Sequence, residues 1–524
     1  MEQFLIFDNV SYPVLSMLVF TPILGAIGLF FINSQYMMKI WGLFITLLTA
    51  VISIPLYTRF DTTTAKYQFA ELYQWFPTIN LNYVLGIDGI SVLLVILTTF
   101  VMPLCILCSW NYIDKRIREF LFVILIMEAA MIGVFVSLNT VLFYIFWEAM
   151  LIPMYLLIAV WGGTRKDYAS IKFFLYTLIA SIFLLVAIIA LYINTGTFFI
   201  PELMGRNFAF SFQLWVFLAC AIAFAVKVPM FPLHTWLPAA HVEAPTAGSV
   251  ILAAVLLKMG GYGFLRLCLP ITPLATQACV PYLIALSLAS IIFGGYLALG
   301  QNDIKKLIAY SSVGHMGFVT LGIFVLNTAG LKGAMLQMIN HGITTGALFI
   351  CIGIIYERTQ SRDLKVNSAI GMFMPIYVTF LGIFSLSSLA FPGTNSFVGE
   401  FLVLVGAFKK SKLVGAIAIP GAVLAAAYML RLLQKMVWAD SDGHKHGDGS
   451  ERGLFDLDLR EKLTLAFLTF FVFWIGLNPE PLLNIMDESI NHLLIQYNDG
   501  ITQAVDSSEG LNHALKTVKC FIAG

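Results

Sequence analysis

Charged residues are scarce in this 524-residue chain, where Asp, Glu, Lys and Arg together make up only 11% of the sequence. A soluble domain usually carries about 25% charged residues, so the composition excludes an ordinary soluble protein. The formal net charge is only +1 and no long basic run occurs. This balance gives no indication of a nucleic acid or an acidic substrate as a partner.

Cysteine is also scarce, and the seven cysteines are scattered. Cys105 and Cys108 form a C-x-x-C, but without a second pair it favours packing inside an apolar segment over a metal or redox site. The chain also lacks a Gly-rich dinucleotide loop and a cysteine framework for iron–sulfur clusters. We therefore expect no metal, cofactor or redox centre in this chain.

Hydrophobic residues, by contrast, make up 59% of the chain. Apolar stretches of about 20 residues, the length that a hydrocarbon core of ~30 Å requires, recur fourteen times. They lie near residues 14–33, 36–57, 88–110, 119–137, 139–161, 169–194, 212–243, 246–268, 280–300, 306–326, 331–356, 369–410, 412–438 and 460–477. The pattern predicts an all-α polytopic membrane protein with about 14 transmembrane helices.

Two of these stretches, 212–243 and 369–410, are too long for one straight crossing. Prolines at 229, 232 and 238 interrupt the first, and the FPG sequence at 391–393 interrupts the second. Broken backbone at membrane depth is tolerated only where it lines a polar cavity or is buried in protein. Paired discontinuous helices are typical of transporters built from two inverted repeats, with the site near the middle of the membrane.

The distribution of lysine and arginine predicts the orientation. Loops after odd-numbered stretches hold eighteen of these residues, and loops after even-numbered stretches hold eight, Arg266 among them. By the positive-inside rule the odd loops are cytoplasmic, so both termini are expected on the periplasmic side of a bacterial inner membrane. The tail from 478 onward carries apolar residues at helical spacing and predicts an amphipathic helix on the outer surface.

Six ionisable residues occupy positions near the centres of separate apolar stretches. Burial in general lowers the pKa of a lysine and raises the pKa of a carboxyl group, so such groups can exchange protons near neutral pH. The alternative for any one of them is a packing salt bridge or a histidine bonded to a backbone carbonyl. Opposite charges make Glu148 and Lys227 the natural ion pair. The six residues are Glu148, Lys227, Lys258, His315, His341 and Glu400.

Further polar positions have two interpretations each. Glu128 either feeds the same pathway or bonds to a neighbouring backbone. Around the first break, the residues His234, Thr235, His241 and Glu243 line either the cavity or its mouth. Ahead of the tenth stretch, Asp303, Lys305 and Lys306 serve either membrane orientation or proton entry.

Four segments resemble a known family, the antiporter-like membrane subunits of respiratory complex I. They read FWEAMLIPMYLLIAVWGG, FAVKVPMFPLHTWLPAAHVEAPTAGSVILAAVLLKMGGYG, DIKKLIAYSSVGHMGFV and LAFPGTNSFVGEF. Glu400 favours the branch named subunit M, or subunit 4 in mitochondria, because subunits L and N usually carry lysine at that position. Asn139 departs from the pattern, since many relatives have an acidic residue there.

The resemblance implies two inverted five-helix repeats, each with one discontinuous helix. It divides the chain into residues 1–110 (helices 1–3), 111–270 (first repeat), 271–438 (second repeat) and 439–524 (helix 14 and the amphipathic tail).

It also implies roles for the six central residues. Glu148 and Lys227 form a modulating ion pair, and Lys258 is the connecting lysine. His315 and His341 bridge from this lysine to Glu400, the terminal proton carrier.

The resemblance places NADH, FMN, iron–sulfur clusters and quinone in other subunits, with subunits L and N and the lipid bilayer as the partners of this chain. The predicted function is proton translocation driven by redox chemistry elsewhere in a NADH:quinone oxidoreductase. The alternatives are a cation/proton antiporter subunit, a hydrogenase-type membrane arm of the same fold, or a structural spacer that does not conduct.

Overall fold

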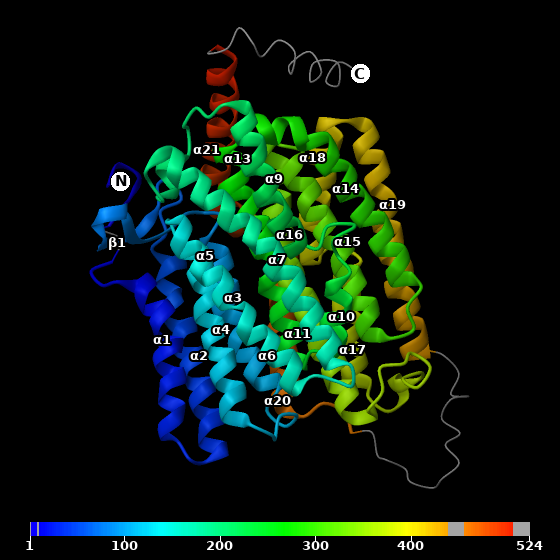
Figure 1. The fold of residues 1–524 in the computed structure, drawn as a ribbon. Helices are drawn as coiled ribbons and strands as arrows, with labels where there is room; N and C mark the ends of the chain where they lie inside the picture. Colours follow the sequence, from blue (N-terminus) through cyan, green and yellow to red (C-terminus); the bar gives the residue numbers. More distant parts are fainter. Residues whose placement is uncertain (1, 8–9, 439–454, 507–524) are drawn as a thin grey trace.

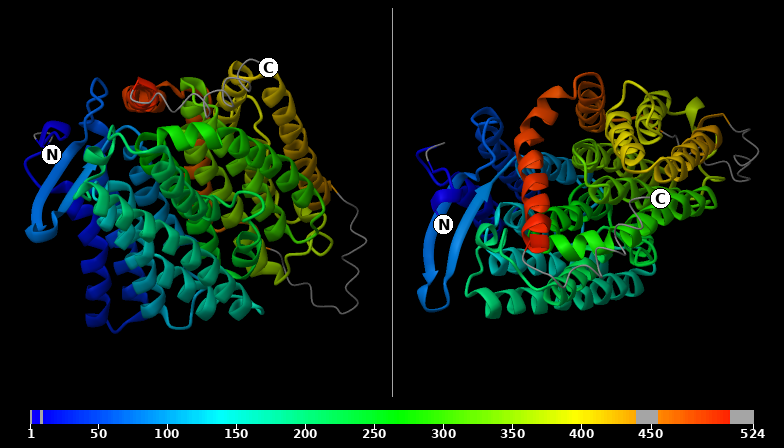
Figure 2. Two further views of the ribbon diagram at one scale, coloured as in Figure 1. Left: turned by 45° about the horizontal axis from the view of Figure 1, so that its top comes forward. Right: turned by 90° about the horizontal axis from the view of Figure 1, so that it is seen from above.

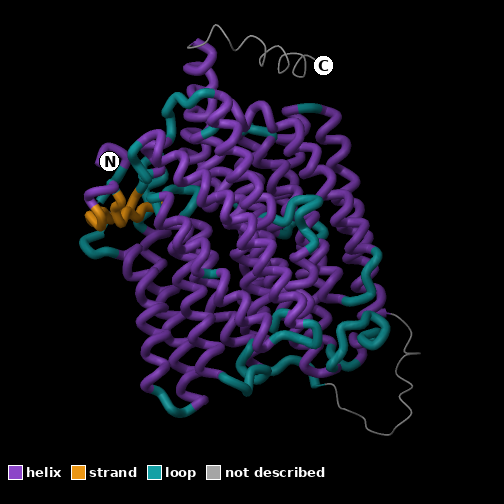
Figure 3. The backbone as a smooth tube through the Cα atoms, viewed as in Figure 1, coloured by secondary structure: helices purple, strands orange, loops and turns teal. Residues whose placement is uncertain are grey.

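A computed structural model of the protein describes residues 2–7, 10–438 and 455–506, and it is a bundle of helices with one small sheet at its upper end (Figures 1 and 3). The predicted helical class is correct. Eleven helices in the described ranges are long and apolar enough to cross a membrane, or twelve if the bent pair of the last two helices counts as one span. Two further apolar helices, at Val92–Cys108 and Pro375–Ser388, are shorter.

The N-terminal part contains three helices and a β-hairpin that the sequence analysis did not predict. The hairpin lies at the upper end of the bundle (Figures 1 and 2), with β1 antiparallel to β2 and Tyr73 opposite Tyr83. Its strands are rich in aromatic and β-branched residues, which suit a pleated surface, and Asn80 supplies the left-handed conformation at the turn. The elements are α1 (Val14–Gly28), α2 (Gln35–Thr58), β1 (Gln68–Phe76), β2 (Leu81–Ile87) and α3 (Val92–Cys108).

The next part of the chain contains the first broken helix. At the predicted break, α9 ends at Lys227 and α10 begins only at Trp236, with Pro229 and Pro232 between them. The elements are α4 (Ile117–Val136), α5 (Thr140–Ala149), α6 (Leu151–Trp161), α7 (Lys166–Thr195), α8 (Ile200–Leu203), α9 (Phe210–Lys227), α10 (Trp236–Glu243), α11 (Thr246–Ile251), α12 (Leu257–Gly263) and α13 (Leu269–Ile271). Two π-helical turns, Leu252–Leu256 and Phe264–Cys268, join the last three into one rod.

The second broken helix lies where the sequence predicted it. The break falls between α17 and α18, and Gly393 within it has a φ of 91° that a residue with a Cβ rarely adopts. The remaining elements are α14 (Pro273–Leu299), α15 (Ile304–Phe324), α16 (Thr328–Thr359), α17 (Pro375–Ser388), α18 (Asn395–Lys410), α19 (Lys412–Leu433), α20 (Leu459–Leu477) and α21 (Glu480–Asp506).

Burial separates central helices from peripheral ones. The apolar segments of α16 and of the rod from α11 to α13 are entirely buried by other helices, whereas α1, α2 and α7 expose many large apolar side chains. Exposed apolar faces of this kind are expected where lipid surrounds the protein. The centre of the bundle is therefore where polar side chains are shielded from both water and lipid.

The C-terminal helix α21 confirms the predicted amphipathic tail. Its buried residues Leu482, Met486, Ile490, Leu493 and Tyr497 recur at helical spacing. A bend of 66° separates α21 from α20, and α21 packs on the ends of α13, α14 and α16. It lies across the upper end of the bundle (Figure 2).

Candidate functional site

Lys258 is fully buried at the centre of the bundle on α12. Its Nζ donates to the carbonyl oxygen of Ala253 and lies 2.6 Å from Nδ1 of His341 on α16. The π-helical turn explains the first contact. The N–H of Leu257 bonds to the carbonyl of Leu252, whereas in an α-helix it would bond to that of Ala253. The local winding therefore leaves a carbonyl available to the lysine, and π-helical turns are frequent at functional sites.

His315 and Glu400 form a second buried pair. Nδ1 of His315, on α15, lies 2.7 Å from Oε1 of Glu400, on α18 just after the second break. On the other side of the ring, Nε2 lies 3.2 Å from Oγ of Ser388 and 3.4 Å from the hydroxyl of Tyr428. Both members of the pair are at least 95% buried, so the contact is shielded from solvent.

The two pairs face each other across a short gap. The ring centroids of His341 and His315 are 5.8 Å apart and the rings are tilted by 60°. Nε2 of His341 and Oε2 of Glu400 are buried without a hydrogen-bond partner. Four of the six predicted residues, Lys258, His341, His315 and Glu400, are thus brought together from four helices into one array.

Lys227 and Glu148 lie apart from this array. Lys227 is buried at the end of α9, with its Nζ 5.1 Å from the ring centroid of Trp147. The charge of the half-buried Glu148 acts on it electrostatically, but among the described residues no ion pair of 4.0 Å or less joins the two. The predicted pair is therefore an electrostatic neighbour and not a direct contact.

The accessory residues fall into different environments. Glu128, on α4, is completely buried and neither carboxylate oxygen has a partner, so the interpretation of a bond to a neighbouring backbone is wrong. His241 is buried, stacks on Phe349 with the centroids 4.5 Å apart, and has two ring nitrogens without partners. An unpaired buried polar group is costly, which makes both residues candidates for function.

The remaining accessory residues border the first break. His234 is 7% exposed, and its Nδ1 has no partner. Thr235 is exposed and lies 3.1 Å from the hydroxyl of Tyr176, so it belongs to the outer surface. Glu243 is buried at the end of α10, where Oε2 accepts from the backbone N–H of Arg165.

Sequence reasoning missed one participant in the array, Gln337. It lies one helical turn before His341 on α16, and its Nε2 donates to Oε1 of Glu400 at 2.9 Å. The spacing of four residues was the signal available, because residues at i and i+4 share a helix face. Asn139, where an acidic residue was expected, caps α5, and its Oδ1 accepts the backbone N–H groups of Val141 and Leu142.

A buried ion pair at the upper end corrects the placement of Arg266 in a loop. Arg266 is 4% exposed, and its guanidinium donates to Oδ1 of Asp88 at 2.6 Å and to the hydroxyl of Tyr67 at 2.8 Å. Burial alone would raise the pKa of Asp88, but the charge of Arg266 and hydrogen bonds from Arg266 and Ser91 hold that pKa below its usual value. The pair joins the hairpin region to the central rod.

No group of His, Cys, Asp and Glu side chains in the described ranges is arranged to hold a metal ion. Among those residues the array offers only proton donors and acceptors.

Comparison with known proteins identifies the family. The family model described as "NADH:quinone oxidoreductase/Mrp antiporter, TM" matches residues 137–425, and that described as "NADH-ubiquinone oxidoreductase chain 4, amino terminus" matches residues 15–134. The Arabidopsis thaliana NADH-ubiquinone oxidoreductase chain 4 is 44% identical over 486 residues, which cover 92% of this chain and 97% of the relative.

A bacterial relative and a solved structure agree. The Rhodobacter capsulatus NADH-quinone oxidoreductase subunit M is 42% identical over 478 residues, covering 89% of this chain and 92% of the relative. A chain of respiratory complex I from Thermus thermophilus superimposes with a TM-score of 0.83 at 28% identity, over 92% of this chain and 99% of that one. The branch favoured by Glu400 is confirmed. The chain belongs to the family whose members are named NADH-quinone oxidoreductase subunit M or NADH-ubiquinone oxidoreductase chain 4.

Proposed function

We propose that this chain moves protons across a membrane as a membrane-arm subunit of a NADH:quinone oxidoreductase. The observation that carries the proposal is the buried array of Lys258, His341, His315 and Glu400, in which two hydrogen-bonded pairs face each other across a short gap. Ionisable side chains inside a membrane are costly and mark ion or proton pathways. Family membership supports the same function.

A proton travels from Lys258 through His341 and His315 to Glu400. The ring centroids are 5.8 Å apart, and Nε2 of His341 has no protein partner, so a water molecule at this nitrogen completes the path in our proposal. Glu148 acts on Lys227 through charge alone, so a shift of either side chain changes the field at the array without breaking a hydrogen bond. Moving one charge against 100 mV costs about 2.3 kcal/mol, and two pKa units correspond to about 2.7 kcal/mol. A pKa shift of two units therefore corresponds to about the free energy needed to move one proton against 100 mV.

The finer architecture belongs to the same proposal. We place fourteen spans in the chain by counting the short helices α3 and α17 and treating α20 as a separate crossing. Residues 111–270 and 271–438 form two inverted repeats, and the presence of one broken helix in each supports this division.

Its setting is the bacterial inner membrane, with both termini on the periplasmic side and with subunits L and N as neighbours. NADH, FMN, iron–sulfur clusters and quinone are held by other subunits, and this chain binds no cofactor.

Isosteric replacement of Glu400 tests the proposal. In membrane vesicles that contain the assembled complex, Glu400→Gln should abolish NADH-driven proton pumping and depress quinone reduction with it, because the amide cannot carry a proton. Glu488→Gln, at an exposed position on α21, is the matched control. If Glu400→Gln pumps at the wild-type rate, the array is structural and the spacer alternative takes its place.

A cation/proton antiporter is the second candidate, because the family model that matches residues 137–425 also describes Mrp antiporters. The two functions differ in their dependence on redox chemistry. Sodium-dependent proton exchange without NADH, and no co-purification with NADH-oxidising subunits, would favour the antiporter. A hydrogenase-type arm predicts co-purification with hydrogenase subunits instead.

A further inference from the structure

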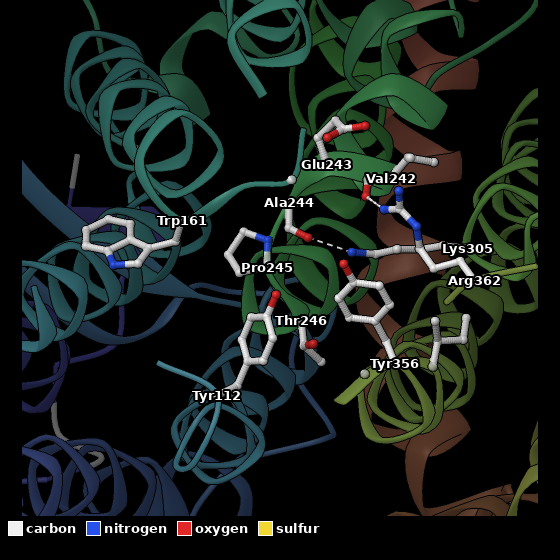
Figure 4. A pocket seen from close by; sticks show the side chains of 13 residues that line it. Tyr112, Trp161, Val242, Glu243, Ala244, Pro245, Thr246, Lys305, Tyr356 and Arg362 are labelled. Atoms are coloured by element: carbon white, nitrogen blue, oxygen red, sulfur yellow. Dashed lines mark hydrogen bonds between the residues drawn. The ribbon is translucent and has the colours of Figure 1, made fainter. Parts of the chain in front are cut away.

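The lower end of the bundle holds a small cavity of about 30 Å³, which is large enough to hold water. Figure 4 shows that it lies beneath the end of α10, with Lys305 and Glu243 on one side and Tyr112 and Trp161 on the other. Tyr112 and Trp161 also line a wide surface depression of about 700 Å³. The cavity therefore adjoins the outside through a shared wall.

Two cations bind the end of α10 at this cavity. The last carbonyl groups of a helix have no partner within the helix, and they form the negative end of its dipole. Arg362 donates to the carbonyl of Val242, and Nζ of Lys305 donates to the carbonyl of Ala244 (Figure 4). The backbone N–H of Gly163 donates to the carbonyl between them, at Glu243. The amine of Lys305 is thus held by a neutral carbonyl group, that of Ala244.

The carboxylates near Lys305 are engaged elsewhere. Oδ1 of Asp303 accepts the backbone N–H groups of Lys305 and Lys306, and its Oδ2 faces Arg362 at 3.6 Å. Glu243 accepts from the backbone of Arg165. Within the described part of the chain, no carboxylate lies at ion-pair distance from the Lys305 amine, which is 92% buried. Because no carboxylate pairs with it directly, this lysine can lose its proton, whereas Arg362 cannot.

His241 connects this end of the helix with the central array. It precedes Glu243 by two residues on α10, and both of its ring nitrogens are buried without a partner. It interacts electrostatically with Lys305 and also with Lys258 and His341 of the array. A neutral imidazole can accept a proton at one ring nitrogen and release one from the other.

We propose that Lys305 is the gate through which protons enter the array from the lower face. This inference rests on the proposed function and assigns its entry point. Lys305 gives one proton to neutral His241 and becomes a neutral amine, and it then regains a proton from water in the cavity. His241 passes the proton to Lys258 and His341. The permanent charge of Arg362 beside the cavity disfavours a second cation there, so one proton enters at a time.

Substitution by arginine separates charge from proton transfer. Lys305→Arg keeps the positive charge and the hydrogen-bond donors but cannot release a proton at physiological pH. In the assembled complex we expect NADH-driven proton pumping to fall at least about tenfold, because a positioned acid–base group typically contributes a factor of 10²–10⁴. Lys365→Arg, at an exposed position in the loop after α16, is the matched control and should pump normally. Wild-type pumping by an assembled Lys305→Arg complex would overturn the proposal.

A histidine variant provides a readout that a structural role would not change. Lys305→His places an imidazole, with an ordinary pKa of about 6.5, at the gate, and burial beside Arg362 disfavours its charged form. The pH profile of pumping should therefore acquire a new inflection at or below about pH 6.5. The groups that share its environment, namely Asp303, Glu243, Arg362, Tyr112 and His241, are unchanged in this variant. If the Lys305→Arg complex does not assemble, the pH profile of Lys305→His tests the proposal instead. A profile identical to that of the wild type would refute the gate.

Glu400→Gln, measured in parallel, separates the two proposals. Loss of pumping in Glu400→Gln with normal pumping in Lys305→Arg leaves the proposed function standing and refutes only the gate. Normal pumping in both refutes both.

Discussion

Replacing Asp88 by asparagine should destabilise the protein far more than the loss of one surface charge would. Both side chains of the Asp88–Arg266 pair are at least 94% buried. The variant removes the counter-charge and leaves a buried guanidinium with only neutral acceptors, namely the new amide oxygen and the hydroxyl groups of Tyr67 and Tyr262. Removing one member of a buried pair typically costs about 3–5 kcal/mol. We expect a loss of that size for Asp88→Asn at neutral pH.

The double variant Asp88→Leu/Arg266→Met makes the reasoning quantitative. It removes both charges and keeps apolar volume, and such replacements are often neutral or even stabilising. The double variant should therefore be more stable than Asp88→Asn alone, although it carries two substitutions. Asp499→Asn, at an exposed carboxylate on α21, is the control and should have little effect.

The pH dependence follows from the lowered pKa of Asp88. A carboxyl group whose pKa is lower in the folded state stabilises the fold above its unfolded pKa, about 3.9 for aspartate. That contribution is lost as the pH falls through the folded value. Wild-type protein should lose this part of its stability only in acid, whereas Asp88→Asn lacks it at every pH.

Buried thiols supply the assay. Cys268, two residues after Arg266, is free and 1% exposed, and Cys220 is free and 4% exposed. A thiol-reactive dye added to the purified protein in detergent reports unfolding as these cysteines become accessible. If Asp88→Asn unfolds at the wild-type midpoint, or if the double variant is the less stable of the two, the account of the pair is wrong.

Two further substitutions test the array and the packing of the C-terminal helix. Gln337→Leu removes a hydrogen bond to Glu400 worth about 1.5–3 kcal/mol and should slow NADH-driven proton pumping about tenfold, while an unchanged rate would show that Gln337 does not tune the carboxylate. In Gly89→Ala the new Cβ would clash with the backbone oxygen of Ile485. Docking of α21 should weaken, and its amide hydrogens should exchange faster. In Gly382→Ala the new Cβ meets no atom within 4 Å, so the amide hydrogens of α21 should exchange at the wild-type rate. Equal exchange rates in the two variants would contradict the predicted clash.

The sequence contained enough information to place the two breaks and four members of the array. Proline cannot donate a backbone hydrogen bond, so the cluster at 229–238 had to end α9 near Lys227. Isolated charges in long apolar stretches have few satisfactory environments other than one another. This is why Lys258 and Glu400 could be assigned to one site before the helices were placed.

Other features depend on contacts that no local pattern reveals. The hairpin lies between two spans, and its strands of nine and seven residues are short beside the apolar stretches of about 20 residues that dominate the chain. Arg266 was placed in a loop because its partner Asp88 is 178 residues away in sequence. The pairing of Lys258 with His341 and of His315 with Glu400 likewise depends on which helices are neighbours. Hydrophobic periodicity does not specify which helices pack together.

The two π-helical turns that flank α12 have a consequence for the evolution of this rod. Each turn holds one residue more than the α-helical turn it replaces. Deleting a residue elsewhere in a helix rotates everything beyond the deletion by about 100°, which would swing Lys258 away from His341. A deletion inside Leu252–Leu256 or Phe264–Cys268 would instead restore regular winding and leave both flanking faces aligned. We therefore expect length changes in this rod to be tolerated at those two turns and nowhere between them.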